Sequence, residues 1–335
     1  MKTKKTALRT IIFLLCTAIA IGSVSVSFSA LAESIAAPGN TRPNLAPVAK
    51  NLEFTTFRDI ALIERFAASD PENDTLTFEI ASQPRRGTVV SVGDGTFIYT
   101  PRERFRGRDR FTYVAVDALG NVSAEATVRI NVIRRTTGTD YADMGGNSAA
   151  FAAMFLAENG IFTGETLGGR HFFRPAKTVT RGEFLTMSLK ISGIETLTGV
   201  IRTGFHDDAD IPMWIKPYVS TALMSGVIRG YRNYHGNLVF SPYSPITFSE
   251  AAVILNNILD IPDVISVAAV QTKPGTPVWA YTAATNLKST GVMPTGVTDI
   301  YNRHVTRADA AKMLLAAHTL LESGDGGSAL LGWAR

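Results

Sequence analysis

The sequence has few of the residues and motifs that most enzymes use for chemistry. It contains one cysteine, Cys16, and five histidines among 335 residues. No histidine falls in a His-Glu-x-x-His pattern, which disfavours a zinc hydrolase. A Gly-x-Ser-x-Gly elbow, a P-loop and a Gly-x-Gly-x-x-Gly helix start are also missing. We therefore predict that the protein is not an enzyme.

A long apolar run is present only near the start, at residues 11–26. It follows the basic stretch MKTKKTALRT and precedes Ala30-Leu31-Ala32, which has the form of a signal-peptidase site. This predicts a signal peptide at residues 1–32 and a secreted protein without a membrane span after cleavage. A retained membrane anchor is the alternative. Because cleavage also removes Cys16, the mature chain would have no disulfide and no thiolate metal site.

The mature chain also lacks an excess of either charge. The whole sequence has 33 Lys and Arg residues and 29 Asp and Glu residues. Four of the basic residues lie in the predicted signal peptide, namely Lys2, Lys4, Lys5 and Arg9. Without them, 29 basic residues remain against 29 acidic ones. The sequence pI of about 9.2 is then mostly a property of the signal peptide, and it does not indicate a nucleic acid partner.

Residues 46–133 alternate apolar and polar residues, as strands do. The alternation is clear in TLTFEIA, GTVVSV, GTFIYTP, DRFTYVAVD and ATVRINVI, with turn sequences such as DPEND, QPRRG and DALGN between them. About seven short strands in about 90 residues predict an all-β, immunoglobulin-like sandwich. Residues 33–45 before it have the composition of a flexible lead-in, and residues 134–140 that of a linker.

From residue 141 the apolar residues follow a helical spacing, in six segments that form three pairs. Each pair has a glycine after its first helix, then a loop, then a second helix opened by TRGE, TFSE or TRAD. The sequence therefore predicts a second domain at 141–323, an all-α domain of three repeats at about 141–193, 203–262 and 272–323. A glycine-rich tail follows at 324–335.

The opening of each second helix has the pattern of a capping box, in which a threonine side chain and an acid three residues later each bond the other's backbone N–H. The three predicted pairs are Thr180 with Glu183, Thr247 with Glu250, and Thr306 with Asp309.

The capping box does not explain the residue that follows the threonine, which is Arg181 or Arg307 in two copies and Phe248 in the middle one. A cation in the first turn of a helix is mildly unfavourable. Two explanations stay open: an anion docks beside the arginine and the free helix N–H groups, or the arginine is solvated and paired with a local acid.

These features resemble S-layer homology (SLH) domains. The resemblance is carried in the second unit by Phe205-His206-Asp207, Trp214, GVIRG and Phe240-Ser241-Pro242, and in the first by Tyr141-Ala142-Asp143, GIFTG, Phe173-Arg174-Pro175 and TRGE. The third unit has Trp279, GVMPT and TRAD but lacks the Asp start and the Phe-x-Pro loop. In the first unit, Ser148 takes the place of the tryptophan.

The resemblance implies a pseudo-trimeric helical bundle that anchors an exported protein non-covalently to a cell-wall polymer, often a pyruvylated secondary polysaccharide. It implies that the arginines pair with acidic groups of the ligand and that aspartates and tryptophans line the grooves. The candidate ligand-binding residues are Arg181, Arg307, Asp143, Asp207, Trp214 and Trp279. Because Phe248 and Ser148 depart from the pattern, we expect one or two working grooves. For both tryptophans, packing in the core is the alternative.

The β region resembles bacterial immunoglobulin-like or cadherin-like modules, through SDPENDTLTFEIASQPRRGTV and the Phe-x-Gly-x-Asp-x-Phe-x-Tyr stretch within FRGRDRFTY. Some of these modules bind calcium at the Asp-rich turn. Carboxylates on turns suit calcium, and the candidates here are Asp70, Glu72, Asp74 and Asp117. Asx-turns and loop solvation are the alternative explanation.

We therefore predict an exported, non-catalytic cell-envelope protein. Its SLH part would bind a secondary cell-wall polysaccharide or a peptidoglycan-linked polymer through helix N-termini and arginines, and the sandwich would act as a spacer or binding module. A wall-active hydrolase with an unrecognised site and a calcium-dependent adhesin are the other functions considered. The basic stretch from Pro84 to Arg110 suits anionic glycans or a solvated rim. His206-Asp207-Asp208 has the composition of a metal or acid–base cluster, but we assign it to the start of the second SLH unit.

Overall fold

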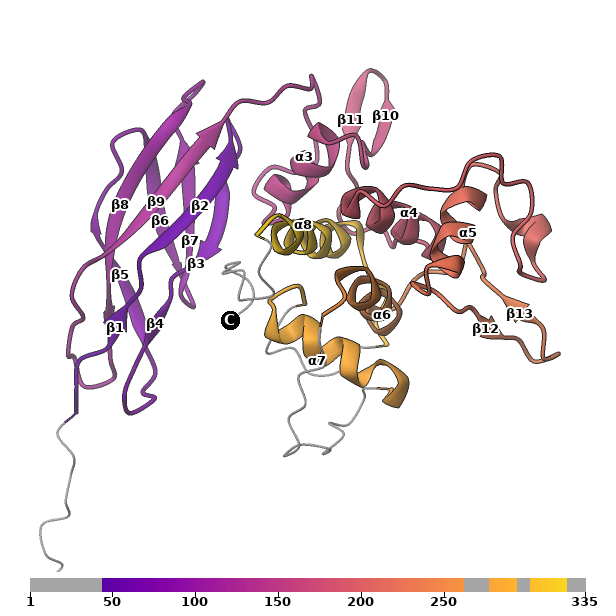
Figure 1. The fold of residues 1–335 in the computed structure, drawn as a ribbon. Coiled ribbons are helices and arrows are strands. Elements are labelled where there is room, and N and C mark those ends of the chain that lie inside the picture. Colours follow the sequence, from indigo (N-terminus) through magenta and orange to yellow (C-terminus); the bar gives the residue numbers. More distant parts are fainter. Residues whose placement is uncertain (1–43, 262–276, 294–301, 324–335) are drawn as a thin grey trace, which may run out of the picture. The chain divides into compact units, whose positions relative to one another are not determined.

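The computed structural model describes residues 44–261, 277–293 and 302–323. The predicted signal peptide, most of the lead-in and the glycine-rich tail lie outside the described residues. Within them, strands come first along the chain and helices follow (Figure 1). No helix in these ranges has the length and apolar character needed to cross a membrane.

The first part contains nine strands: β1 Val48–Ala49, β2 Leu52–Phe57, β3 Leu62–Arg65, β4 Ala68–Ser69, β5 Thr77–Ser82, β6 Gly87–Gly93, β7 Thr96–Pro101, β8 Gly107–Val116 and β9 Ala126–Ile133.

Two sheets form the sandwich. The four-stranded sheet has the order β2-β9-β8-β5, in which β2 is parallel to β9 and the other pairs are antiparallel. The three-stranded sheet has the order β3-β7-β6, and β1 pairs with β4. Every second residue of β8 and β9 is buried over most of their length, as expected when one face of a sheet packs on another sheet. The predicted β-sandwich is therefore confirmed.

Asp109 organises one end of this core, although a carboxylate is costly to bury. It is 7% exposed, and its oxygens accept hydrogen bonds from the backbone N–H groups of Arg85 at 3.1 Å and Arg86 at 2.9 Å. The Tyr99 hydroxyl donates a third bond at 2.9 Å. Burial, together with this bond, raises the pKa of Tyr99 well above its usual value. The carboxylate thus joins β8 to β7 and to the turn before β6.

Among the described residues, the second part contains six helices: α3 Ala150–Glu158, α4 Arg181–Ser192, α5 Lys216–Met224, α6 Phe248–Leu259, α7 Tyr281–Ser289 and α8 Arg307–Ser323. Short elements lie between them: β10 Glu165–Leu167, β11 Arg170–Phe172, β12 Tyr231–Arg232, β13 Leu238–Val239 and the 3-10 turns η2 Asp208–Asp210 and η3 Val278–Ala280.

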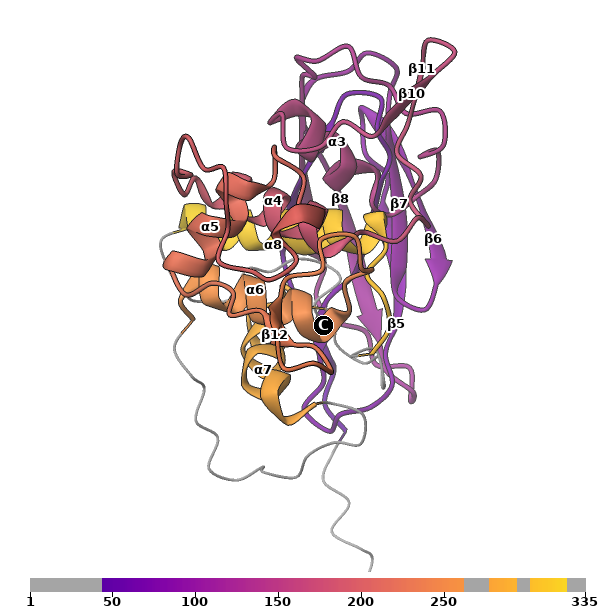
Figure 2. The same cartoon turned by 90° about the vertical axis from the view of Figure 1, so that its right-hand side faces the viewer.

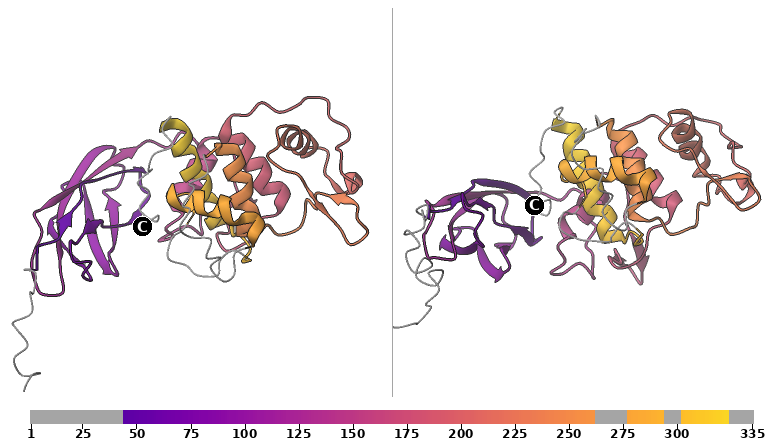
Figure 3. Two further views of the ribbon diagram at one scale, coloured as in Figure 1. Left: turned by 60° about the horizontal axis from the view of Figure 1, so that its bottom comes forward. Right: turned by 90° about the horizontal axis from the view of Figure 1, so that it is seen from below.

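The three second helices α4, α6 and α8 contact one another at the centre of this part (Figure 3). The first helices pack around them, with α5 on α4, α7 on α6 and α3 on α8. Figure 2 shows α7 beside α6. Each first helix thus packs on the second helix of another unit and not on its own, so that the three units are interlocked.

A ring of three backbone hydrogen bonds joins the segments that lead into the central helices. The N–H of Val179 donates to the carbonyl of Val305 at 2.9 Å, and the N–H of Val305 donates to that of Ile246 at 2.9 Å. The N–H of Ile246 closes the ring on the carbonyl of Val179 at 3.0 Å. All three side chains are at most 1% exposed. The ring satisfies backbone groups that burial would otherwise leave unpaired.

The capping boxes lie immediately after this ring, as the sequence predicts. In α4 and α6 the threonine oxygen accepts the N–H of the glutamate, and the glutamate accepts the N–H of the threonine. In α8, Asp309 and Thr306 make the same two bonds at 3.2 and 3.0 Å. The interpretation of these residues as caps is confirmed for all three helices.

The Asp109 network generates a stability prediction. Asp109→Ala leaves two partly buried N–H groups and the buried Tyr99 hydroxyl without their acceptor, so we expect a loss of roughly 3 kcal/mol in the free energy of unfolding. Tyr99→Phe removes one donor and should cost about 1 kcal/mol. Urea unfolding of residues 45–133 measures both. Glu79→Ala, an exposed change on β5, is the control and should stay within about 0.5 kcal/mol of wild type. Equal stability of Asp109→Ala and the control would contradict this role.

Candidate functional site

The interlocked helix pairs create three related sites, which differ in the residues they present. Site 1 lies around Arg307 and Glu183, site 2 around Arg181 and Glu250, and site 3 around Phe248 and Asp309. In each, the residue that follows the capping threonine of one unit lies near the capping acid of the next unit.

Site 2 is an open groove of about 620 Å³. Arg181 Nη2 donates to Glu250 Oε1 at 2.6 Å, and the Arg181 guanidinium lies 5.3 Å from the centre of the Tyr231 ring. Trp279, which is 61% exposed, also lines this groove. Arg229 lines it too, is exposed, and has no ion pair in the part of the chain that the structure describes. The groove thus combines an exposed aromatic surface with a net positive charge.

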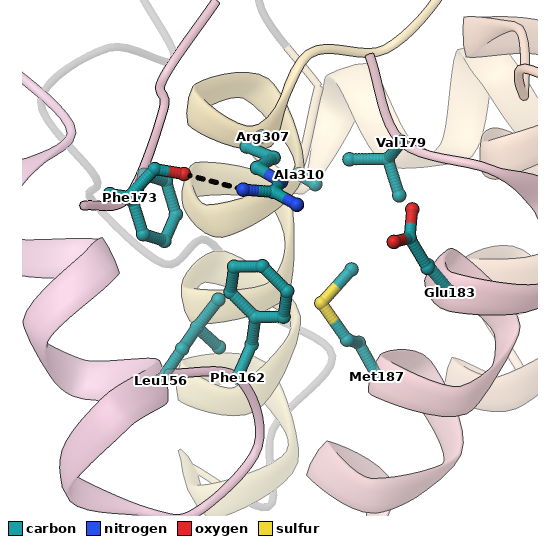
Figure 4. A pocket seen from close by; sticks show the side chains of 8 residues that line it. All are labelled: Leu156, Phe162, Phe173, Val179, Glu183, Met187, Arg307 and Ala310. Carbon is teal, nitrogen blue, oxygen red and sulfur yellow. Dashed lines mark hydrogen bonds between the residues drawn. The ribbon is translucent and has the colours of Figure 1, made fainter. Parts of the chain in front are cut away.

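Site 1 is closed (Figure 4). Arg307 is only 5% exposed, and its Nη1 donates to the carbonyl of Phe173 at 3.0 Å. The Phe162 ring covers its guanidinium, with 4.9 Å between the Cζ atom and the ring centre. The remaining cavity is about 10 Å³, hardly enough for one water molecule.

Glu165, on the hairpin β10–β11, supplies the counter-charge in site 1. Its Oε1 accepts Arg307 Nη2 at 3.0 Å and Lys177 Nζ at 2.8 Å, and Arg174 lies 2.7 Å from Oε2. The hydrogen bond from Lys177, then that from Arg307 and the charges of Arg307 and Arg174, lower the pKa of the Glu165 carboxyl. Sequence reasoning missed this partner, which lies 142 residues from Arg307. The Gly168-Gly169 pair would have predicted the hairpin, though not the ion pair.

Site 3 contains both departures from the SLH pattern. Phe248 is fully buried, and the guanidinium of Arg303 lies 4.8 Å from its ring centre and 3.5 Å from Asp309 Oδ1. Ser148 takes the place of the tryptophan just before α3, the helix that packs on α8. Its hydroxyl accepts a hydrogen bond from Lys312 Nζ on α8. Site 3 thus has Phe248 in the place of the arginine and Ser148 in the place of the tryptophan, whereas site 2 is lined by both Arg181 and Trp279.

The prediction that free helix N–H groups bind the anion is wrong. In α4, the N–H of Arg181 donates to the carbonyl of Ser244 at 2.9 Å, and that of Gly182 to the carbonyl of Pro242 at 2.9 Å. In α8, the N–H of Arg307 donates to the carbonyl of Lys177 at 2.8 Å, and that of Ala308 to the carbonyl of Pro175 at 3.0 Å. The capping threonines bond the third N–H group of each helix, so that these first-turn donors are not left for a ligand.

Neither arginine is solvated either, so the alternative explanation is correct only in part. Each pairs with an acid, but the acid comes from a distant segment, and the side chains are 15% exposed for Arg181 and 5% for Arg307. Because the partner carboxylates offset the charge in the first turn, an external anion is not needed to explain these positions.

The predicted groove residues Asp143 and Asp207 hold the Phe-x-Pro loops. Asp143 accepts the N–H groups of Phe173 at 2.9 Å and Arg174 at 2.7 Å. Asp207 binds the equivalent pair, Phe240 and Ser241, at the same two distances. The second residue of each pair has φ of 56°, an unfavourable backbone conformation for a residue other than glycine, and the carboxylate stabilises it.

The sequence His206-Asp207-Asp208 is not a metal or acid–base cluster in the described chain. Asp207 binds the loop, and Asp208 accepts Thr203 N at 2.6 Å and Lys216 Nζ at 2.7 Å. These contacts lower the pKa of Asp208 from 3.8 to about 2, and the hydrogen bond from Lys216 is the largest cause. These structural roles agree with the interpretation of the three residues as the start of an SLH unit, and not with a catalytic or metal-binding role.

Three of the four predicted calcium ligands come together in the sandwich. Carboxylate oxygens of Asp70, Asp74 and Asp117 lie within 4.8 Å of one another. Asp70 Oδ1 accepts the N–H groups of Glu72 at 3.0 Å and of Asp74 at 2.9 Å, while its Oδ2 is buried without a hydrogen-bond partner in the described part of the chain. Glu72 instead accepts the N–H of Leu45 at 3.3 Å and lies outside the group.

Each of the two parts of the chain matches a known protein family. Residues 44–134 match the family model of the bacterial cadherin-like domain, and residues 140–185 match that of the S-layer homology domain. The chain carries both of these domains. The two resemblances predicted from the sequence are therefore confirmed. An SLH domain indicates anchoring at the cell wall or cell surface, and the cadherin-like domain indicates a surface adhesion module.

Solved structures match only part of the chain. An endo-fucoidan hydrolase of glycoside hydrolase family 107 is 23% identical over 28% of this chain and 14% of its own, with a TM-score of 0.23. The SrpA adhesin of Streptococcus sanguinis is 14% identical over 31% of this chain and 65% of its own, with a TM-score of 0.24. The chain thus spans less than two thirds of either protein, and these matches carry no functional argument. No curated protein matches.

The Asp208–Lys216 pair generates a prediction on pH. Because the pKa of Asp208 is lower in the folded chain than in the unfolded one, its contribution is complete above about pH 4 and is lost as the pH falls towards 2. We expect Asp208→Asn to be less stable than wild type at pH 7 by roughly 1–2 kcal/mol, with the difference closing near pH 2.

Urea unfolding followed by tryptophan fluorescence measures this effect. Asp210→Asn removes the same charge from an exposed neighbour in η2 and should show no pH-dependent difference. A constant difference between Asp208→Asn and wild type from pH 7 to pH 2 would show that ionisation of Asp208 is not responsible.

Proposed function

We propose that the protein is an exported, non-catalytic envelope protein, anchored to an anionic secondary cell-wall polysaccharide by three SLH repeats in one pseudo-threefold bundle. The SLH match of residues 140–185 and the cyclic backbone ring through all three units support this assignment. The ring requires the second and third units to supply the same structural segment as the first.

The open groove of site 2 is the observation on which the proposal rests. Arg181 and Arg229 give it two cations against one carboxylate, that of Glu250. Trp279 and Tyr231 offer flat apolar surfaces that suit the faces of sugar rings. An acidic sugar, such as a pyruvylated one, matches both features. Site 1 offers no such space, because Phe162 and Glu165 occupy it.

The acids in the groove support a non-catalytic role. Glycoside hydrolysis in most families needs two carboxyl groups that flank the bond to be cleaved. Among the described residues that line site 2, Glu250 is the only acid, and it bonds both Arg181 and its own helix cap. Glu183, the other carboxylate considered for hydrolysis, is bound in the cap of α4.

The two tryptophans give a matched test. Trp279 is 61% exposed beside site 2, and Trp214 is 59% exposed before α5, which packs on α4. We expect Trp279→Ala to weaken binding to purified cell walls at least about tenfold, or about 1.4 kcal/mol, and Trp214→Ala to change it less than about twofold. Co-sedimentation of the chain without residues 1–32 measures both, before and after hydrofluoric acid strips the secondary polymer.

Binding that survives stripping would remove the secondary polymer as the ligand. Equal losses in the two variants would mean that both sites bind. Release of soluble sugar from the walls on prolonged incubation would instead favour the hydrolase.

A calcium-dependent sandwich is the second proposal, favoured by the buried Oδ2 of Asp70 that has no partner. Three converging carboxylates repel one another unless a cation lies between them, and hard oxygen ligands suit calcium. Asp70, Asp74 and Asp117 would hold the ion, which would join the Asp-rich turn to the turn after β8.

Thermal unfolding tests calcium binding. We expect millimolar calcium to raise the melting temperature of the sandwich by roughly 5 °C. Asp74→Asn should abolish the shift, whereas Glu72→Gln, the same type of change two residues away, should keep it. No shift in the wild-type protein would leave the sandwich as a passive spacer, and a shift that survives in Asp74→Asn would move the ion elsewhere.

A further inference from the structure

The exposed face of the four-stranded sheet carries a second groove, of about 880 Å³. It runs over β8 and β9 and reaches the turn between β5 and β6. Five arginines line it: Arg85, Arg86, Arg108, Arg110 and Arg129. All five are exposed. Residues 33–335 have equal numbers of acids and bases, so this cluster reflects a local segregation of charge and not a general excess.

The arginines of this groove lack partners. In the part of the chain that the structure describes, none of the five guanidinium groups makes an ion pair or hydrogen bond. Arg110 lies directly opposite Arg129 in the β8–β9 register. Like charges in such a cross-strand pair are destabilising, so the fold gains nothing from this arrangement.

The two acids that line the groove do not neutralise it. The Asp109 carboxylate is buried and accepts the Tyr99 hydroxyl and the N–H groups of Arg85 and Arg86. Glu53 is exposed next to Arg129 in the β2–β9 register but lies in none of the ion pairs of the described residues. An anionic partner from outside the chain therefore fits this face.

The other lining residues narrow the class of anion. Thr127 and Asn131 present hydroxyl and amide groups beside the arginines, and both types bond sugar hydroxyls. The lining residue Phe111 is 1% exposed, so it offers no ring for stacking. Single-stranded nucleic acids depend on such stacking. Rows of sulfate, phosphate or carboxylate groups suit arginine, which binds them through two parallel hydrogen bonds.

We propose that this arginine-lined sheet face binds an anionic polysaccharide, independently of the SLH groove. Arg108 and Arg110 are two residues apart on one strand, about 7 Å, and Arg129 lies beside them on the next strand. The three guanidinium groups form a short row of positive charge suited to several acidic groups of one chain. The sandwich then contributes its own contact with a polyanion of the envelope or of a neighbouring surface.

The test uses the chain without residues 1–32 and defined polymers. Dextran sulfate presents sulfate, polygalacturonate presents carboxylate, and unmodified dextran presents neither. We expect binding to one or both charged polymers and not to dextran, with an affinity that falls as NaCl rises. Arg110→Gln/Arg129→Gln should weaken it at least tenfold. Whichever charged polymer binds more tightly identifies the preferred acidic group.

Arg102→Gln/Arg106→Gln is the matched control, because it removes the same charge from exposed positions outside the groove. It should change the affinity less than twofold. Trp279→Ala measures how much of the polymer binding belongs to site 2. The groove variant should melt no lower than wild type, since it removes a like-charge pair.

An equal loss in the two double variants would reduce the effect to net charge and overturn the proposal. A loss in Trp279→Ala alone would assign the binding to the helical part. Equal or tighter binding of a mixed-sequence DNA duplex would replace the polysaccharide with nucleic acid. Failure of wall anchoring through site 2 would leave these results unaffected.

Discussion

Three backbone hydrogen bonds that close a ring hold the helical part in its arrangement. Val179, Val305 and Ile246 come from segments more than fifty residues apart, and each gives one donor and one acceptor to the ring. Such a ring cannot form with two members. It therefore makes the three units interdependent, and it places the start of each central helix next to the start of another. The capping boxes and the two arginines Arg181 and Arg307 lie within a few residues of it.

The ring also explains why the arginines have the partners they have. It brings the first turn of α4 to the capping acid of α6, where Arg181 shares Glu250 with the helix cap. The cyclic relation would bring Arg307 to Glu183, but the hairpin β10–β11 intervenes and Glu165 takes the charge. Small differences in the loops thus turn one related site into an open groove and another into a closed, internally paired cluster. Repetition of sequence does not imply repetition of binding.

The sequence was informative where the signal is local. Strand alternation, helical spacing and the Thr-x-x-Glu caps depend on residues within one or two turns, and each proved readable. It was misleading at the helix N-termini, because the carbonyls that occupy those N–H groups belong to Ser244, Pro242 and Lys177, whose positions only the tertiary fold determines. The same holds for Glu165 as the partner of Arg307. Among the predicted calcium ligands, Glu72 lies outside the carboxylate cluster, because the turn directs its side chain away from that of Asp70 and towards Leu45.

In the sandwich, the residues that hold the fold and those that are free to bind a partner alternate along the same strand. Along β8, Asp109, Phe111 and Tyr113 point into the core, and Arg108 and Arg110 point outward between them. The inward set is constrained by packing and by the bonds of Asp109, so it carries the family pattern that the sequence displays. The outward set makes no contact that the fold requires, and it is free to vary with the partner. A row of unpaired, opposed arginines at such positions costs stability, and an external polyanion offsets that cost where packing cannot.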